Sequence, residues 1–207
     1  GSARGWAAKI LYNNKLRRMF WEFLARDDTL SYWVCNGAQL AGQLGWIPFL
    51  PEKWNAPSVK GHPIFTYNAS KKFESRWSLV RVLPSPSVMF RGLEGCQLGV
   101  HTDHGEGQLH CKNAKLFKRM QDEQLFSLHF VEDDGFTAKV GDYPFNPNGS
   151  PWGYTSMCTP CGRHAVAMTH EERAFQMRQW QYIPESMKRL EFSPWMRAFE
   201  NMRNWYR

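Results

Sequence analysis

Residues 30–45 read LSYWVCNGAQLAGQLG, and this stretch decides the fold that we expect. Four of its first five residues are apolar or aromatic, which is typical of a buried strand in a parallel sheet. Cys35, Asn36 and Gly37 then form a sharp turn, and the residues after them have the character of a helix. The stretch therefore predicts a strand, a turn and a helix in an α/β protein, with a cysteine on the turn.

A turn of this kind is a good position for a nucleophilic cysteine. It exposes the sulfur at the carboxyl end of the sheet, where open α/β proteins bind ligands, and the N–H groups that begin the helix favour a thiolate. The best candidate for a base is His170, at the end of an apolar strand expected over 164–170, and Glu172 could orient its imidazole. From spacing alone, a buried and inert cysteine is the commoner explanation.

Length and composition exclude several classes of protein. The chain has 207 residues, of which 43% are hydrophobic and 22% charged, so a packed core of one or two domains is expected rather than disorder. No apolar run is long enough to cross a bilayer, and no signal peptide is visible, so we expect no membrane partner. Five cysteines cannot all pair, which favours a reducing, cytoplasmic location. The net charge of +7 comes from scattered basic residues, so nucleic acid is not the expected partner.

The rest of the chain can be divided by periodicity and by turn-forming residues. A Pro- and Trp-rich stretch at 47–63 has no clear period and is interpreted as a surface insertion. The apolar residues of the final helix have helical spacing, which favours a place in the core or at a domain interface. The sequence predicts helices at 15–26, 114–124 and 194–205, strands at 30–34, 76–83, 125–131 and 164–170, and loops at 104–107 and 143–153.

Several segments together resemble one known family. VCNGAQL at 34–40 is similar to the nucleophile elbow of class I glutamine amidotransferase domains, and more narrowly to that domain of phosphoribosylformylglycinamidine synthase. Further similar segments follow in the family's order: GSARGWA at 1–7, FESRWSLVRV at 73–82, HGEG at 104–107, YPFNPNGSP at 143–151, HEER at 170–173 and SPWMRAFENMRNW at 193–205. The resemblance covers nearly the whole chain, residues 1–207. It implies an α/β fold with a flavodoxin-like open sheet, here incomplete at its N-terminal side.

The resemblance implies hydrolysis of the glutamine side-chain amide by a Cys-His-Glu triad. Cys35 matches the nucleophile, His170 the base, and Glu172 the carboxylate that holds the histidine in the correct tautomer. The backbone N–H of Asn36 matches one donor to the oxyanion. Three further residues fall where the family contacts glutamine or shapes the exit for ammonia: Gln39, His104 and Glu106.

The family resemblance also implies partners. The released ammonia would pass to a separate synthetase domain, which uses ATP and magnesium to convert formylglycinamide ribonucleotide to the amidine. No Gly-rich phosphate loop is visible here, so we expect no cofactor and no metal in this segment. The 207 residues are expected to be the C-terminal part of the amidotransferase domain of a larger polypeptide. The family's first strands and its Gly-rich oxyanion loop would precede Gly1, which would leave a central edge of the sheet exposed.

Two residues depart from the family pattern and motivate other functions. Glu171 stands where the family has proline, and an extra carboxylate beside His170 can raise its pKa or compete with Glu172. Ala38 replaces a second cysteine. The main alternative is an inactive homologue that serves as a structural subunit of a viral, organellar or ribonucleoprotein assembly. A protein deamidase with the same triad is a third candidate.

A second motif suggests half of a zinc site. Cys158 and Cys161 form a CxxC pair, and His164 follows three residues later. No second CxxC pair exists, so His101 and His104 would have to complete the site. A hairpin turn that happens to contain cysteines is the simpler explanation.

Overall fold

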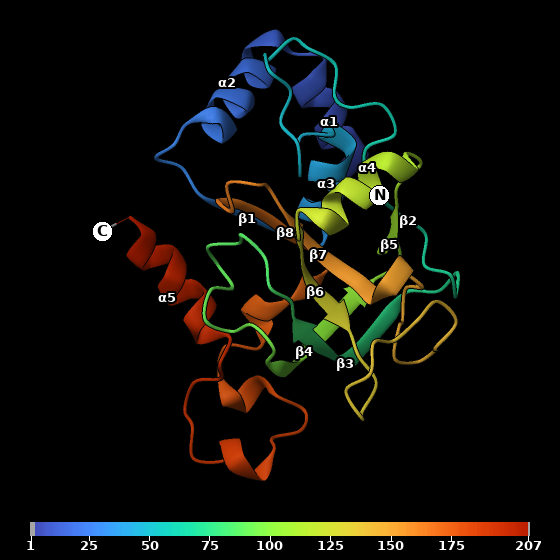
Figure 1. The fold of residues 1–207 in the computed structure, drawn as a ribbon, viewed down its shortest axis with the longest axis vertical. Coiled ribbons are helices and arrows are strands. Elements are labelled where there is room, and N and C mark those ends of the chain that lie inside the picture. Colours follow the sequence, from blue (N-terminus) through green and yellow to red (C-terminus); the bar gives the residue numbers. More distant parts are fainter. Residues whose placement is uncertain (1–2, 207) are drawn as a thin grey trace.

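The computed structural model describes residues 3–206 and has a mixed α/β architecture (Figure 1). Its α-helices are α1 (Ala3–Leu11), α2 (Asn14–Ala25), α3 (Asn36–Leu44), α4 (Ala114–Asp122) and α5 (Met196–Trp205). Its strands are β1 (Ser31–Val34), β2 (Ile64–Thr66), β3 (Glu74–Val82), β4 (Gln97–His104), β5 (Gln108–His110), β6 (Phe126–Phe130), β7 (Tyr154–Cys158), β8 (His164–Ala167) and β9 (Thr169–His170). Short 3-10 helices lie at Pro151–Gly153, Glu171–Arg173, Met177–Gln179 and Glu185–Met187.

Local capping explains where two of the predicted helices begin. The Asn13 side chain accepts a hydrogen bond from the N–H of Leu16 at 3.1 Å, which caps α2. Asn113 caps α4 in the same way, through the N–H of Leu116 at 3.0 Å. These caps satisfy N–H groups that have no acceptor within the helix. The expected helices at 15–26 and 114–124 are therefore confirmed, whereas α1 was not predicted.

Within residues 3–206, the main sheet has seven strands in the order β1-β8-β7-β6-β3-β4-β9, and only β1 and β8 pair in parallel. The expectation of a strand buried within a parallel sheet at 30–34 is therefore wrong. β1 is a half-buried strand at the end of the sheet. Its aromatic residues misled the prediction because they cover both faces: Tyr32 packs against one hydrophobic cluster and Trp33 against the two others.

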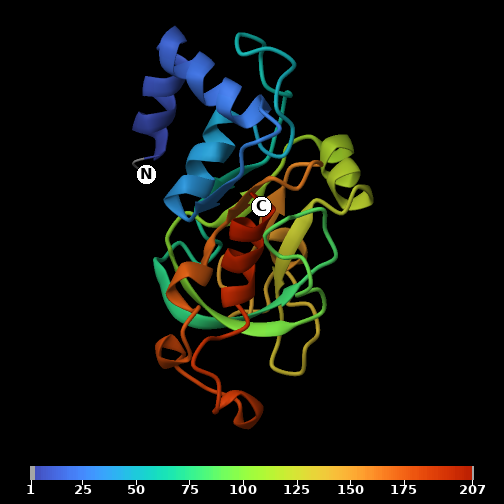
Figure 2. The same ribbon diagram turned by 90° about the vertical axis from the view of Figure 1, so that its left-hand side faces the viewer.

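The segment 164–170 connects distant parts of this sheet. β8 pairs with β1 and β7, β9 pairs with β4, and only Met168 separates β8 from β9. Residues 164–170 therefore pair with strands at opposite ends of the sheet, with β1 at one end and β4 near the other. The chain bends at Met168 between the two pairings. Figure 2 shows the strong curvature of the long strands β3 and β4 that accompanies this arrangement.

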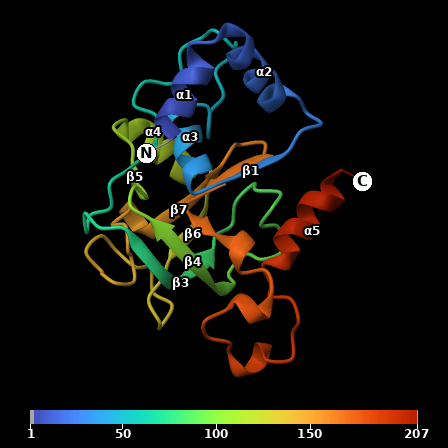
Figure 3. The ribbon, with the colours of Figure 1, turned by 180° about the vertical axis from the view of Figure 1, so that it is seen from behind.

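Helices cover the sheet on both sides. In Figures 1 and 3, α1 to α4 lie together on one side of β1, β8 and β7, and α5 lies on the other. The core on the α5 side includes Trp195, which is fully buried, and Ala198. This confirms that the apolar face of the final helix belongs to the core. Residues of α3 and α4 pack with Met157, Val166 and Met168 on the opposite side.

The stretch 47–63 contains no helix or strand, in agreement with the sequence prediction. Its beginning is not on the surface, however. Ile47 is 1% exposed, Pro48 and Pro51 are also buried, and the chain becomes mainly exposed or half-buried from residue 52 onward. The Trp21 indole N–H donates to the carbonyl of Pro51 at 2.8 Å, which fastens this segment to α2. No helix within residues 3–206 is long and apolar enough to cross a membrane.

Gly162 in the turn before β8 has a backbone conformation that leaves no room for a side chain. Its φ is +71°, and a Cβ atom there would lie 1.9 Å from the carbonyl oxygen of Pro86. We expect Gly162→Ala to destabilise the protein by about 3 kcal/mol, combining left-handed strain with a backbone clash. Urea denaturation followed by tryptophan fluorescence measures this loss.

Gly95 provides the matched control, because its φ is +82° but a Cβ atom there would meet nothing within 4 Å. Gly95→Ala should cost only about 1–2 kcal/mol, the strain alone. Equal losses for the two variants would show that the packing against Pro86 is not as described.

Candidate active site

Cys35 lies between the end of β1 and the start of α3, in the strained conformation expected of an exposed nucleophile. Its φ is 51° and its ψ is −104°, a region that residues with a Cβ atom rarely occupy. The N–H of Cys35 donates to the carbonyl of Ala167 at 2.8 Å, which fixes the turn against β8. The predicted strand, turn and helix are therefore present, and the cysteine is on the turn.

The register of β1 and β8 brings the histidine to the cysteine. Val34 is paired with Ala167, and His170 follows three residues later, beyond the bend at Met168. Pairing of His170 with His101 of β4 holds the end of this segment in place. The 135 positions between Cys35 and His170 in the sequence are therefore bridged by a single pair of parallel strands.

The imidazole of His170 is held by a carboxylate. Its Nδ1 lies 2.6 Å from Oε1 of Glu172, and the His170 side chain is 7% exposed. Burial alone would lower the pKa of His170, but interactions with the Cys35 side chain and with Glu172 raise it to about 9. Nε2 of His170 is buried without a conventional hydrogen bond to another group in residues 3–206, so this nitrogen is left for the thiol. The structure thus brings Cys35, His170 and Glu172 together.

The start of α3 contributes N–H groups beside the sulfur. Asn36 is the first residue of the helix and is exposed, and the first N–H groups of a helix have no acceptor within it. Gln39, one turn further, donates from its side-chain amide to the carbonyl of Glu106 at 2.7 Å. This bond fastens the helix to the 104–107 loop, so Gln39 and Glu106 lie next to each other.

His104 is buried and is not accessible to a ligand. It is 2% exposed, its Nδ1 lies 3.1 Å from the carbonyl of Met168, and its Nε2 lies 3.2 Å from the side-chain nitrogen of Asn148. Burial lowers its pKa to about 4, so the ring is neutral near pH 7, with Nδ1 as donor and Nε2 as acceptor. A Cβ atom at Gly107 would lie 2.1 Å from this ring, which explains the glycine there. His104 therefore supports the loop from within.

Asp103, which lies beside the cysteine, and Arg173, which binds Asp103, were not assigned to the site from the sequence. The Cys35 thiol donates to the carbonyl of Asp103 at 3.5 Å. The Asp103 carboxylate accepts from the Ser75 hydroxyl at 2.5 Å and from the Arg173 guanidinium at 3.1 Å. The hydrogen bond between Ser75 and Asp103 forms because these two residues are paired across β3 and β4. Only knowledge of the strand register could have predicted it.

Glu171 does not compete with Glu172 for the histidine. It is fully buried, and its carboxylate accepts hydrogen bonds from the hydroxyls of Tyr32 and Thr169, the latter at 2.6 Å. Burial raises the pKa of Glu171 to about 7, although both hydroxyls act to lower it. Glu172 is therefore the hydrogen-bond partner of His170, and Glu171 belongs to a separate contact between β1 and β9.

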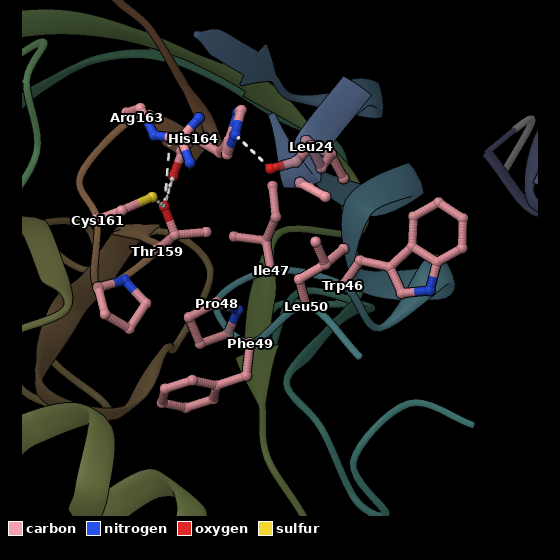
Figure 4. Close-up of a pocket in the computed structure, with 12 residues that line it drawn as sticks. Leu24, Trp46, Ile47, Pro48, Phe49, Leu50, Thr159, Cys161, Arg163 and His164 are labelled. Atoms are coloured by element: carbon pink, nitrogen blue, oxygen red, sulfur yellow. Dashed lines mark hydrogen bonds between the residues drawn. The ribbon is translucent and has the colours of Figure 1, made fainter. Parts of the chain in front are cut away.

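The residues of the suggested half zinc site lie along one hairpin but in different environments. Cys158 is buried in β7, Cys161 is exposed, and both ring nitrogens of His164 are engaged, by the Ser31 hydroxyl and the Leu24 carbonyl. Within residues 3–206, no three His, Cys, Asp or Glu side chains are grouped so that they could hold a metal. Cys161 and His164 instead line a cavity of about 400 Å³ between the end of α2, residues 46–50 and the turn before β8 (Figure 4).

A thiol, an imidazole and a carboxylate grouped at a strand-to-helix elbow form an arrangement that recurs among cysteine-dependent hydrolases and transferases. A family model described as the CobB/CobQ-like glutamine amidotransferase domain matches residues 1–206. The chain belongs to this family.

Curated relatives support a narrower resemblance. The chain is 38% identical over 208 residues to the phosphoribosylformylglycinamidine synthase of Dictyostelium discoideum and 40% identical over 211 residues to that of Homo sapiens. These matches cover 98% and 99% of this chain but only 15% and 16% of the relatives. The chain therefore corresponds to about one sixth of the length of those proteins.

A solved structure shows the same fold. The structure of PurLQS from Thermotoga maritima matches with a TM-score of 0.56 and 18% identity, covering 86% of this chain and 62% of that chain. This similarity confirms the expected α/β fold of the class I amidotransferase type, with a sheet that is here mostly antiparallel.

The buried, neutral His104 makes stability depend on pH. The pKa of His104 falls from 6.5 to about 4 on folding, so the unfolded chain binds a proton more readily than the folded chain. The contribution of the neutral His104 to the free energy of unfolding is therefore complete above pH 6.5 and is lost as the pH falls towards 4. From pH 7 to pH 5 we expect a loss of about 2 kcal/mol from this residue. Urea denaturation of wild type and His104→Asn at both pH values gives the free energy of unfolding that each loses between pH 7 and pH 5. The difference between these two losses is the contribution of His104.

Replacing the exposed His110 by Asn is the control and should leave the full wild-type loss in place. Burial likewise lowers the pKa of His129 and of His164 to about 4. His104→Asn and His110→Asn should therefore both retain the loss of stability in acid that comes from His129 and His164. If His104→Asn shows the same loss as wild type, the ring is not held neutral in the folded protein.

Proposed function

We propose that this chain hydrolyses the side-chain amide of glutamine and supplies ammonia for purine biosynthesis as the glutaminase part of a phosphoribosylformylglycinamidine synthase. The observation that carries the proposal is the position of Cys35 on a strained elbow beside His170, whose Nδ1 is 2.6 Å from Glu172. The names of the curated relatives support the same reaction.

In the first step, the Cys35 sulfur attacks the amide carbon of glutamine, and His170 holds the proton that the thiol gives up. The raised pKa of His170, about 9, favours the protonated imidazole that must coexist with a thiolate near neutral pH. Glu172 accepts a hydrogen bond from the Nδ1–H group of His170 and thereby keeps Nε2 directed at the sulfur. The N–H of Asn36, at the positive end of α3, stabilises the oxyanion of the tetrahedral intermediate.

In the second step, the intermediate collapses and the C–N bond breaks. His170 returns its proton to the leaving nitrogen, ammonia departs, and the glutamyl group remains on Cys35 as a thioester. Water activated by His170 then cleaves the thioester, which releases glutamate and restores the thiol. The 104–107 loop, fastened by Gln39 and stiffened from within by His104, borders the site where glutamine binds.

The ammonia acceptor is proposed to lie in the remainder of a longer polypeptide. A synthetase domain there would use ATP and Mg²⁺ to convert formylglycinamide ribonucleotide to the amidine. One fact supports this arrangement: the chain corresponds to only 15–16% of the length of the relatives. The proposed location is the cytoplasm, in keeping with five free cysteines, although one relative is named as chloroplastic/mitochondrial.

Replacing Cys35 by Ala in the complete protein should lower glutamine hydrolysis by at least about 10³-fold, because the covalent route is lost. Amidine synthesis supplied with ammonium chloride should continue near the wild-type rate. Glutamate release and amidine formation, measured separately, test both statements.

The exposed Cys161 is the matched control, and Cys161→Ala should leave glutamine hydrolysis within twofold of wild type, or about 0.4 kcal/mol in barrier height. Unchanged glutamine hydrolysis in Cys35→Ala would refute the mechanism. It would favour a structural role for the domain.

Replacing Glu172 by Gln tests the orientation of the imidazole. A neutral amide at this position supports the imidazolium less well, so kcat for glutamine hydrolysis should fall about 10–100-fold while KM stays within about twofold. Steady-state kinetics with glutamine give both constants. A rise in KM with unchanged kcat would instead place Glu172 in substrate binding.

A further inference from the structure

A buried contact unused by the proposed mechanism lies directly beside the triad. Glu171 follows His170 in the chain and is fully buried. One of its carboxylate oxygens accepts from the Tyr32 hydroxyl, and the other accepts from the Thr169 hydroxyl at 2.6 Å. Tyr32 precedes Cys35 by three residues, so one carboxylate joins the strand that carries the nucleophile to the segment that carries the base.

Burial of this carboxylate is tolerated because both oxygens are hydrogen-bonded. An unpaired buried carboxylate would be strongly unfavourable, and such groups are normally exposed. Burial raises the pKa of Glu171 to about 7, and burial together with Glu171 raises that of Tyr32 well above its usual value. Glu172 is the other acidic group that acts on Glu171. The hydroxyl of Tyr32 therefore keeps its proton throughout the neutral range.

Backbone pairing holds Cys35 and His170 through different strands, because Val34, before Cys35, pairs with β8 and His170 pairs with β4. β1 pairs with β8 on one edge, and no strand of residues 3–206 pairs with its other edge. The chain then bends at Met168 before His170, so movement at this bend would change the distance between the sulfur and the imidazole. The Tyr32 ring is itself held by edge-on packing against Phe90, with centroids 6.0 Å apart.

We propose that Glu171 is a positioning residue, which uses its hydrogen bonds to Tyr32 and Thr169 to brace β1 against β9 and thereby holds His170 against Cys35. Glu171 acts through these two neighbours and does not touch the substrate. The kinetic consequence rests on the proposed function, whereas the placement of the imidazole beside the sulfur can be tested without it.

Removing the two hydroxyls one at a time in the complete protein tests the brace. Tyr32→Phe and Thr169→Val should each lower kcat for glutamine hydrolysis about tenfold, with KM within about twofold, because misplacement of a catalytic group reduces the rate of the chemical step. Thr169→Ser keeps the hydroxyl and should restore most of the rate.

Tyr154→Phe is the matched control. Tyr154 is half-buried and stacks on Phe126 at a centroid distance of 3.9 Å, in the hydrophobic cluster formed with α3 and α4. Its loss of a hydroxyl should leave both kinetic constants unchanged.

A second measurement reports on the imidazole and the sulfur alone. The rate at which iodoacetamide alkylates Cys35, followed by mass spectrometry of the peptide that contains it, is recorded from pH 5 to pH 10. A misplaced His170 stabilises the thiolate less, so the midpoint should rise by at least about half a pH unit in Tyr32→Phe and Thr169→Val.

The outcomes separate the two proposals. If the variants lose only thermal stability and keep the wild-type kcat and alkylation midpoint, the brace is structural and the inference is overturned. If the wild-type protein does not hydrolyse glutamine but the midpoint shifts as expected, the brace is supported and the proposed function fails.

Discussion

The site depends on one constraint: the short segment 164–170 pairs with three other strands, β1, β7 and β4. Residues 164–170 pair with β1 and β7 before the bend at Met168 and with β4 after it. Because these hydrogen bonds fix the segment from several directions, the register of β1 also determines where Cys35 lies. The catalytic geometry therefore follows from the pairing of backbones, and only then from the side chains.

Buried polar side chains complete what the backbone begins. His104 is neutral because it is buried, and it joins the segment near Met168 to the loop that contains Asn148. Glu171 is also buried, but it lies between two hydroxyls. In both cases the cost of removing a polar group from water is offset by specific hydrogen bonds, and such bonds are satisfied in only one arrangement of the loops. The polar core around the site therefore favours one structure over others.

The sequence predicted the parts of the fold that local patterns control. Capped, periodic helices such as α2 and α4, the strand-turn-helix around Cys35, and the strand before His170 were all recognisable. Family motifs indicated Cys35, His170 and Glu172, which the fold brings together. Pairing between distant strands was not recognisable, so the mostly antiparallel sheet and the position of Asp103 beside the thiol were missed. The aromatic residues of β1 indicated burial on both faces correctly, but burial of the faces says nothing about whether the edges of a strand are paired.

The backbone conformation of Cys35 has a consequence for the evolutionary history of the domain. Its positive φ would suit glycine better, so a glycine at this position would relieve strain and make the fold more stable. Under the proposed function, a sulfur at this position sacrifices folding stability for reactivity. In a lineage released from selection for the reaction, we expect this cysteine to be among the first residues to drift, and its persistence marks copies of the domain in which the chemistry is still under selection.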